Sequence, residues 1–149
     1  METQEIRQLI DAADNVDFAP FGHGVPEARI ARAEAELGLV FPPTYRWWLS
    51  QYGGGEIDGK EIYSVYDIDN VEGGGDIVYM WKVNRADNAA EPDQLFISEP
   101  GNDESFYFAL DECDSNGEYP VYVFDYVANE HKKYARDFFE FLEKQIGPV

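Results

Sequence analysis

The segment from residue 37 to residue 55 constrains the fold more than any other part of the chain, because three local signals in it agree. Gly38 suits the left-handed residue that ends a helix, and Pro43 suits the first turn of the next one. Beyond the prolines, one helical face is formed by Tyr45, Trp48, Leu49 and Tyr52, at positions i, i+3, i+4 and i+7. The helix then ends at Gly53, Gly54 and Gly55. This segment predicts two consecutive helices, with the aromatic face of the second in the core.

Further helices are expected at both ends of the chain. Apolar residues repeat at helical spacing in residues 2–13 and again between Pro26 and Leu37. A closing helix is expected to begin near Asp137, with an apolar stripe made of Phe138, Phe141, Leu142 and Ile146. Residues 77–85 fit a helix or a strand equally well by periodicity alone.

Between these helices the pattern changes to that of strands. Ile57 and residues 62–66 flank Asp58 and Gly59, a pair that suits a tight turn. Later strands are expected at residues 95–98, 106–110 and 119–126, with Asn116 and Gly117 forming a type I′ hairpin turn before the last of them. This order predicts one α+β domain over residues 1–149, a mostly antiparallel sheet with N-terminal helices and a C-terminal helix packed on it.

The charge of the chain limits the classes of partner. Thirty acidic and eleven basic side chains give a net charge of −19 at pH 7. Nucleic-acid binding is not expected, because it requires Lys and Arg to neutralise phosphates. A basic protein partner would complement this surface, although the charge could equally serve only to keep the protein in solution.

Location is suggested by what the sequence contains. Cys113 is the single cysteine, which fits a reducing compartment and provides neither a disulfide framework nor a thiolate zinc cluster. The first residues do not resemble a signal peptide, and no apolar run is long enough to span a membrane. The sequence is therefore interpreted as that of a cytoplasmic protein with no membrane contact.

The sequence contains no strong catalytic or metal-binding motif. His23 and His131 lie in polar, loop-like surroundings with no nucleophile near them in sequence, and the acidic neighbours of Cys113 disfavour its thiolate. The acidic loop from Glu112 to Gly117 imitates the first half of a calcium loop, but Val123 stands where the bidentate Glu should be. The sequence predicts no enzyme, no cofactor and no dedicated metal site, and leaves open adventitious calcium binding by acidic loops.

The order of elements in residues 34–56 resembles the opening of the SUKH superfamily, also called Smi/Knr-like domains: Glu-Leu-Gly, Pro-Pro-x-Tyr, Trp-Leu and Tyr-Gly-Gly-Gly-Glu. The resemblance implies an α+β interaction module and favours a helix at residues 77–85. It further implies a bacterial immunity protein that neutralises a toxin by direct binding, here a basic, nuclease-like one. The alternative is a regulatory scaffold like the fungal Smi/Knr relatives.

A partner surface is expected where acidic loops meet aromatic side chains at the sheet, the alternative being that each acidic cluster is an independent solvated loop. The residues proposed for it are Tyr66, Asp67, Asp69, Glu99, Asp103, Glu104, Tyr107 and Asp111. Trp47 lies off the apolar stripe of its helix and is expected either to contact the partner or to cover the edge of the helix.

Overall fold

The computed structural model describes residues 1–18, 24–66 and 75–147, and its helices follow the order that the sequence predicts. The helices are α1 (Thr3–Ala12), α2 (Glu27–Leu37), α3 (Pro43–Gln51), α4 (Ile77–Ala86) and α5 (Phe138–Ile146). The strands are β1 (Val16–Asp17), β2 (Gly55–Ile57), β3 (Lys60–Ile62), β4 (Gln94–Ser98), β5 (Glu104–Ala109), β6 (Val121–Asp125) and β7 (Glu130–Ala135). The predicted α+β class is confirmed.

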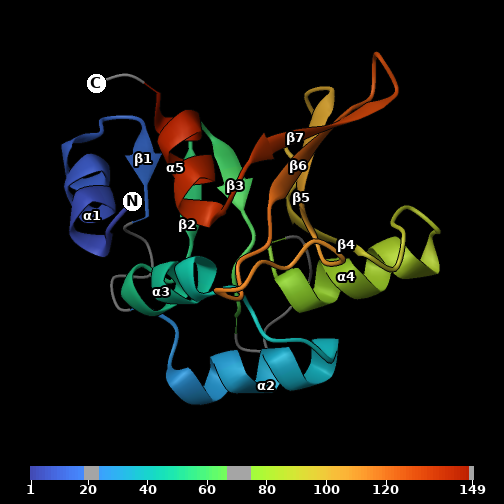
Figure 1. Cartoon of the computed structure of the whole chain (residues 1–149), viewed down its shortest axis with the longest axis horizontal. Coiled ribbons are helices and arrows are strands. Elements are labelled where there is room, and N and C mark those ends of the chain that lie inside the picture. Colours follow the sequence, from blue (N-terminus) through green and yellow to red (C-terminus); the bar gives the residue numbers. More distant parts are fainter. Residues whose placement is uncertain (19–23, 67–74, 148–149) are drawn as a thin grey trace.

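The strands divide between two antiparallel sheets rather than forming one. Strands β1, β2 and β3 make the first sheet, and β4, β5, β6 and β7 make the second, each in sequence order. The two sheets meet where β3 approaches β4: Tyr63 N donates to the carbonyl of Ile97 at 2.7 Å, and Ser98 Oγ donates to the carbonyl of Glu61 at 2.7 Å. Figure 1 shows the resulting layout, with the β6–β7 hairpin extending away from the helices.

The core is built around Tyr45 on α3. Its ring stacks on Trp48 at 5.8 Å and meets Phe108 and Phe138 edge to face at 5.6 and 5.0 Å. Its hydroxyl donates to the backbone carbonyl of Tyr63 at 2.6 Å, so this buried polar group is satisfied. The predicted core face of this helix is confirmed for Tyr45, Trp48 and Leu49, which are fully buried, whereas Tyr52 is the C-cap and is half-buried.

Helix termini explain two further elements. Gly38 adopts the left-handed conformation at the end of α2, with φ 72°, as expected for a helix C-cap. Residues 77–85 are helical, as the family resemblance predicts: the side chain of Asp76 caps α4 by accepting from Tyr79 N at 2.8 Å. Periodicity alone could not have decided this, because the N-cap lies outside the apolar run.

The two predicted tight turns have different outcomes. Asp58 and Gly59 both have positive φ, 52° and 75°, and join β2 to β3 as predicted. The type I′ prediction at Asn116 and Gly117 is wrong, because only Gly117 has positive φ. Instead, Asp114 Oδ1 accepts from the backbone N–H groups of Asn116 and Glu118 at 2.8 and 2.9 Å. This turn belongs to a long connection, residues 110–120, rather than to a tight hairpin.

Strand β7 was not predicted, and it corrects the placement of His131. The sequence places this histidine in a loop, whereas it lies within β7 opposite Phe124. Strand β7 carries exposed Glu130, Lys132 and Lys133 and lacks apolar alternation until Tyr134 and Ala135. It is an edge strand, and such a strand is held by backbone pairing with β6 rather than by burial of its own side chains.

Candidate interaction surface

The four-stranded sheet has two faces of different character. Alternation in β5 directs Phe106 and Phe108 to one face, where they meet Phe141 and Phe138 of α5 at 5.2 and 6.2 Å. Tyr107 points to the opposite face, as the sequence predicts. We call this opposite face the outer sheet face, and it comprises Phe96, Ser105, Tyr107, Tyr122, Phe124, Tyr126 and His131.

Rings on the outer sheet face form a continuous row from β4 to β7. Tyr107 lies 5.3 Å from Phe96 and stacks on Tyr122 at 5.8 Å between ring centroids. On the next pair of strands, Phe124 contacts His131 at 4.4 Å and Tyr126 at 4.6 Å. Such cross-strand aromatic pairs stabilise a sheet, and these pairs therefore hold the rings in fixed positions.

Exposure increases along this row toward the β6–β7 hairpin. Tyr107 is 5% exposed, Phe124 is half-buried, and Tyr126 is 54% exposed. Val127, at the tip of the hairpin, is 78% exposed. The half of the outer sheet face near the hairpin is therefore open to a partner, whereas the half near β4 is covered.

Hydrogen bonds fix the polar tips of the aromatic side chains. Tyr107 Oη and His131 Nδ1 share a hydrogen bond of 2.8 Å, and Tyr126 Oη lies 3.1 Å from Ser105 Oγ. A hydrogen bond to Glu112 raises the pKa of Tyr122 to about 12, and burial raises the pKa of Tyr107. These phenols are neutral at pH 7, so each can both donate and accept a hydrogen bond.

Two hollows lie beside Tyr126. One, of about 370 Å³, is lined by Glu99, Gly101, Asp103, Ser105 and Tyr126. The other, of about 170 Å³, is bounded by residues 88–91 and by Gln94, Phe96, Phe124, Tyr126 and His131. Tyr126 lines both, and we call the first, which contains Glu99 and Asp103, the acidic hollow.

Three of the predicted partner residues meet at or near the outer sheet face. Glu99 and Asp103 line the acidic hollow, and Tyr107 belongs to the covered half of the outer sheet face. Tyr107 is too buried for the direct contact that the sequence suggested. Glu104 and Asp111 are exposed at the beginning of β5 and just beyond its end. Asp67 and Asp69 lie outside the described residues.

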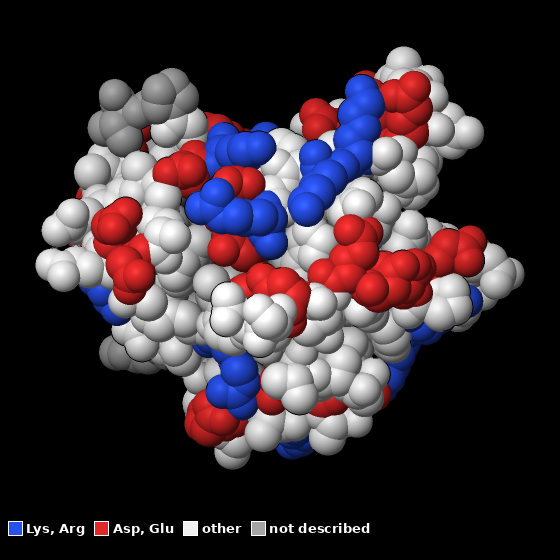
Figure 2. Space-filling model, viewed as in Figure 1, with Lys and Arg blue, Asp and Glu red and all other residues white. Residues whose placement is uncertain are grey.

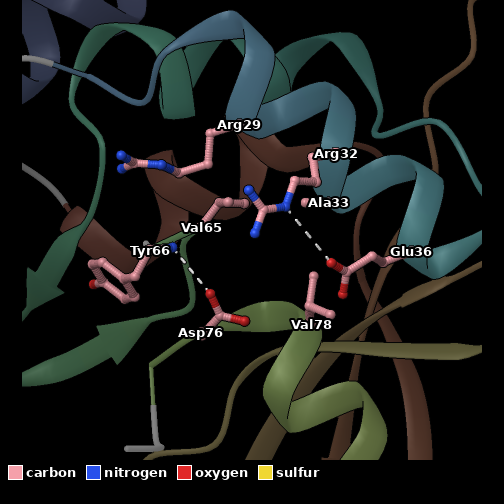
Figure 3. A pocket seen from close by; sticks show the side chains of 8 residues that line it. All are labelled: Arg29, Arg32, Ala33, Glu36, Val65, Tyr66, Asp76 and Val78. Atoms are coloured by element: carbon pink, nitrogen blue, oxygen red, sulfur yellow. Dashed lines mark hydrogen bonds and ion pairs between the residues drawn. The ribbon is translucent and has the colours of Figure 1, made fainter. Parts of the chain in front are cut away.

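Tyr66 lines a separate pocket. This pocket, of about 20 Å³, lies between α2 and the start of α4, with Arg29 and Arg32 projecting from α2 and Asp76 across from them (Figure 3). Asp76 Oδ2 accepts from Tyr66 N at 3.0 Å, and burial raises the pKa of Tyr66 to about 12. The pocket has room for about one water molecule, so the structure does not bring Tyr66 into the acidic hollow.

Trp47 covers the edge of its helix, one of the two expected roles. Its ring meets Phe139 of α5 at 5.3 Å and Tyr52 at 5.8 Å, with the Arg7 guanidinium 5.1 Å from its centroid. These contacts join α1, α3 and α5. Trp47 thus has a structural role that its position off the apolar stripe did not show.

Charge is distributed unevenly on the face seen in Figure 2. Basic side chains run along β7, and acidic side chains gather beneath it in front of α4. Lys132 and Lys133 of β7 are exposed, and so are Asp111, Glu112 and Asp114 of the β5–β6 connection. On this face, acidic side chains of the β5–β6 connection therefore lie beside the basic side chains of β7.

A family model described as SMI1-KNR4 cell-wall, of the SUKH group, matches residues 27–142. The match extends from the first residue of α2 into α5 and includes every strand of the four-stranded sheet. The chain belongs to the SMI1-KNR4 family. The predicted SUKH resemblance is thereby confirmed, and membership supports a role in protein–protein interaction.

Two features of other functional classes are absent from the parts of the SMI1-KNR4 protein that the structure describes. Within residues 1–18, 24–66 and 75–147, no group of three His, Cys, Asp or Glu side chains is placed to hold a metal ion. In the same residues, no helix has the length and apolar character needed to cross a bilayer. Sequence reasoning missed Tyr126, Phe124 and His131 as surface residues, because the strand that completes this surface was not recognised.

Proposed function

We propose that this protein is a bacterial immunity protein that neutralises a toxin domain by binding it in the cytoplasm. The observation that carries the proposal is the open half of the outer sheet face, where Tyr126 and Val127 remain exposed beside carboxylates. Exposed aromatic side chains surrounded by charge are typical of interface hot spots. Membership of the SMI1-KNR4 family supports the same class of function.

The partner proposed is a basic, nuclease-like toxin domain. An enzyme that acts on nucleic acid needs a positive surface to approach phosphates. A chain with a net charge of −19 would compete for that surface and accelerate the encounter. Covering the active site of the toxin is sufficient for neutralisation, so the proposed mechanism requires no catalytic residue in this chain.

Coexpression tests the proposal. The partner is the C-terminal domain of a large secreted protein encoded beside this gene, and this chain should restore growth to cells that produce that domain. The two proteins should elute as a stoichiometric complex, and the toxin should have an unchanged mass and regain activity after separation. Failure to restore growth, or recovery of a chemically modified toxin, would contradict neutralisation by binding.

A second candidate is a regulatory scaffold without a toxin partner. The cell-wall description of the matching family favours it. In that case, deletion of the gene should alter cell-envelope assembly in the absence of any toxin gene. The same deletion under the first proposal leaves the envelope unchanged and makes cells sensitive to the toxin.

A further inference from the structure

The acidic hollow contains a carboxylate that is held in one orientation. Glu99 Oε1 accepts from Tyr63 Oη at 3.1 Å and from Asn84 Nδ2 at 2.9 Å. Asn84 is itself buried on α4, so the donor is fixed by the fold. Both bonds use Oε1, and Oε2 accepts no hydrogen bond from the described residues.

The second carboxylate of the hollow is positioned by the hairpin. Asp103 has φ 75°, and its backbone carbonyl accepts from Tyr126 N at 2.9 Å. This bond joins the β4–β5 turn to the residue that follows β6, beside the tip of the β6–β7 hairpin. The backbones of Asp103 and Tyr126 are therefore held together at the acidic hollow that both residues line.

Neither carboxylate forms an ion pair within the parts of the chain that the structure describes. Elsewhere the protein shows what two such carboxylates can hold. Arg46 lies between Glu27 and Glu34, with Nη1 2.9 Å from Glu27 Oε2 and Nη2 3.1 Å from Glu34 Oε1. Paired carboxylates are well suited to the planar, multiply donating guanidinium group.

The ring of Tyr126 adds a second element of recognition. A guanidinium group stacks favourably on an aromatic face, and within this chain Arg85 lies over Trp81 in this way. In the second hollow, which Tyr126 also lines, the half-buried ring of Phe124 is available to an apolar side chain. The surface thus presents an acidic hollow, the ring of Tyr126 and the ring of Phe124 near one another.

We propose that the outer sheet face docks an arginine-bearing segment of the partner. The guanidinium enters between Glu99 and Asp103 and packs on Tyr126, and a neighbouring apolar side chain of the same segment contacts Phe124. Charge complementarity selects this occupant, because the hollow presents two carboxylates without an internal cation. The proposal rests on the proposed function for the identity of the partner, but the chemistry of the hollow can be tested without it.

A titration of the isolated protein tests the hollow directly. Acetyl-arginine methylamide is added while backbone amide signals are followed by NMR, with the neutral isostere acetyl-citrulline methylamide as the control ligand. We expect saturable shifts at Gly101, Ser105 and Tyr126 with a dissociation constant on the order of 1 mM. Glu99→Gln and Asp103→Asn should each weaken binding about fivefold or more. Equal shifts with citrulline, or unchanged binding by both variants, would overturn the proposal.

A second experiment uses the toxin domain and a matched pair of double variants. Glu99→Gln with Asp103→Asn should weaken the complex by about 30-fold or more, because two charge-assisted contacts are lost. Asp11→Asn with Asp14→Asn changes the net charge equally at exposed sites on and after α1, and should weaken it less than about threefold. Asparagine tolerates the positive φ of residue 103, so the fold is preserved.

The outcomes separate the two proposals. If both double variants weaken the complex alike, the toxin binds elsewhere and the docking proposal is wrong, while neutralisation by binding stands. If the wild-type chain neither protects cells nor binds the toxin domain, the proposed function fails, and the arginine titration still decides whether the hollow binds a guanidinium group.

Discussion

The carboxylate of Glu118 caps helix α3 by accepting from Thr44 N at 3.0 Å and from Thr44 Oγ1 at 2.7 Å. The two residues are 74 positions apart, and Pro42 and Pro43 provide no N–H groups and no side-chain cap. Thr44 therefore carries the first free N–H of the helix, and the β5–β6 connection satisfies it. This pair links the predicted Pro-Pro-x-Tyr motif to the half of the chain that bears the outer sheet face.

Removal of this cap should destabilise the fold. We expect Glu118→Ala to lower the free energy of unfolding by about 1–2 kcal/mol, because a half-buried helix N–H and a hydroxyl lose their acceptor. Asp111→Ala, at an exposed site in the same connection, should change it by less than about 0.5 kcal/mol. Urea unfolding of both variants measures the difference, and equal stabilities would show that the cap contributes nothing.

The same residue should make stability depend on pH. Burial raises the pKa of Glu118 above its usual 4.5, and the charges of Asp137 and Asp114 add to this, outweighing the lowering by the Thr44 hydrogen bonds. The folded state therefore favours protonated Glu118. The contribution of this protonation to the stability of the fold is complete below pH 4.5 and is lost as the pH rises through the raised pKa. Glu118→Gln does not titrate, so its stability relative to wild type should increase as the pH rises from 4.5 through the raised pKa. The contact with Thr44 is kept, because the Thr44 hydroxyl can accept from the Gln amide. A difference that is constant with pH would contradict this.

Two glycines in positive-φ positions should respond differently to substitution. At Gly59, φ is 75° and an added Cβ meets no atom within 4 Å, so Gly59→Ala should cost about 1 kcal/mol of backbone strain. At Gly55, an added Cβ would lie 2.3 Å from the carbonyl oxygen of Asp17 and 2.7 Å from Cα of Phe18. Gly55→Ala should therefore cost at least about 3 kcal/mol, because strand β1 must move away. Thermal unfolding distinguishes the two, and equal costs would exclude a role for this close approach.

Electrostatic steering predicts a strong effect of salt on complex formation. Between about 0.01 and 0.15 M ionic strength the Debye length falls from roughly 30 to 8 Å, which screens the −19 charge from a basic toxin. The association rate constant should fall about tenfold or more, with a smaller change in the dissociation rate constant. Stopped-flow fluorescence measures both, and a salt-independent association rate would remove the argument from net charge.

Apolar spacing and backbone chemistry explain which parts of the fold were predictable. Tyr45, Trp48 and Leu49 form an apolar stripe on one face of a helix, and such a stripe is stable only when it packs into the core. Asp58 and Gly59 can both adopt positive φ, so the turn between β2 and β3 follows from their identities. At Asn116 and Gly117 the same reasoning failed, because the side chain of Asp114 supplies the acceptor that organises the turn.

The candidate surface was less predictable than the core. Glu99 and Asp103 were proposed from their acidic character, and the structure brings both into one hollow. Tyr126 was not proposed, because its role depends on the pairing of β6 with β7. Strand β7 has a polar sequence that gives no alternation signal, and only the backbone partners of β6 reveal it.

The lysines of β7 have a consequence for self-association. If two copies of Glu130–Ala135 paired in full antiparallel register, Lys132 of one copy would lie opposite Lys133 of the other. Like charges facing each other across strands oppose such pairing. The exposed edge of β7 is therefore protected against pairing with a second copy of this chain. Contacts with other proteins are then expected on the face of the sheet rather than at this edge.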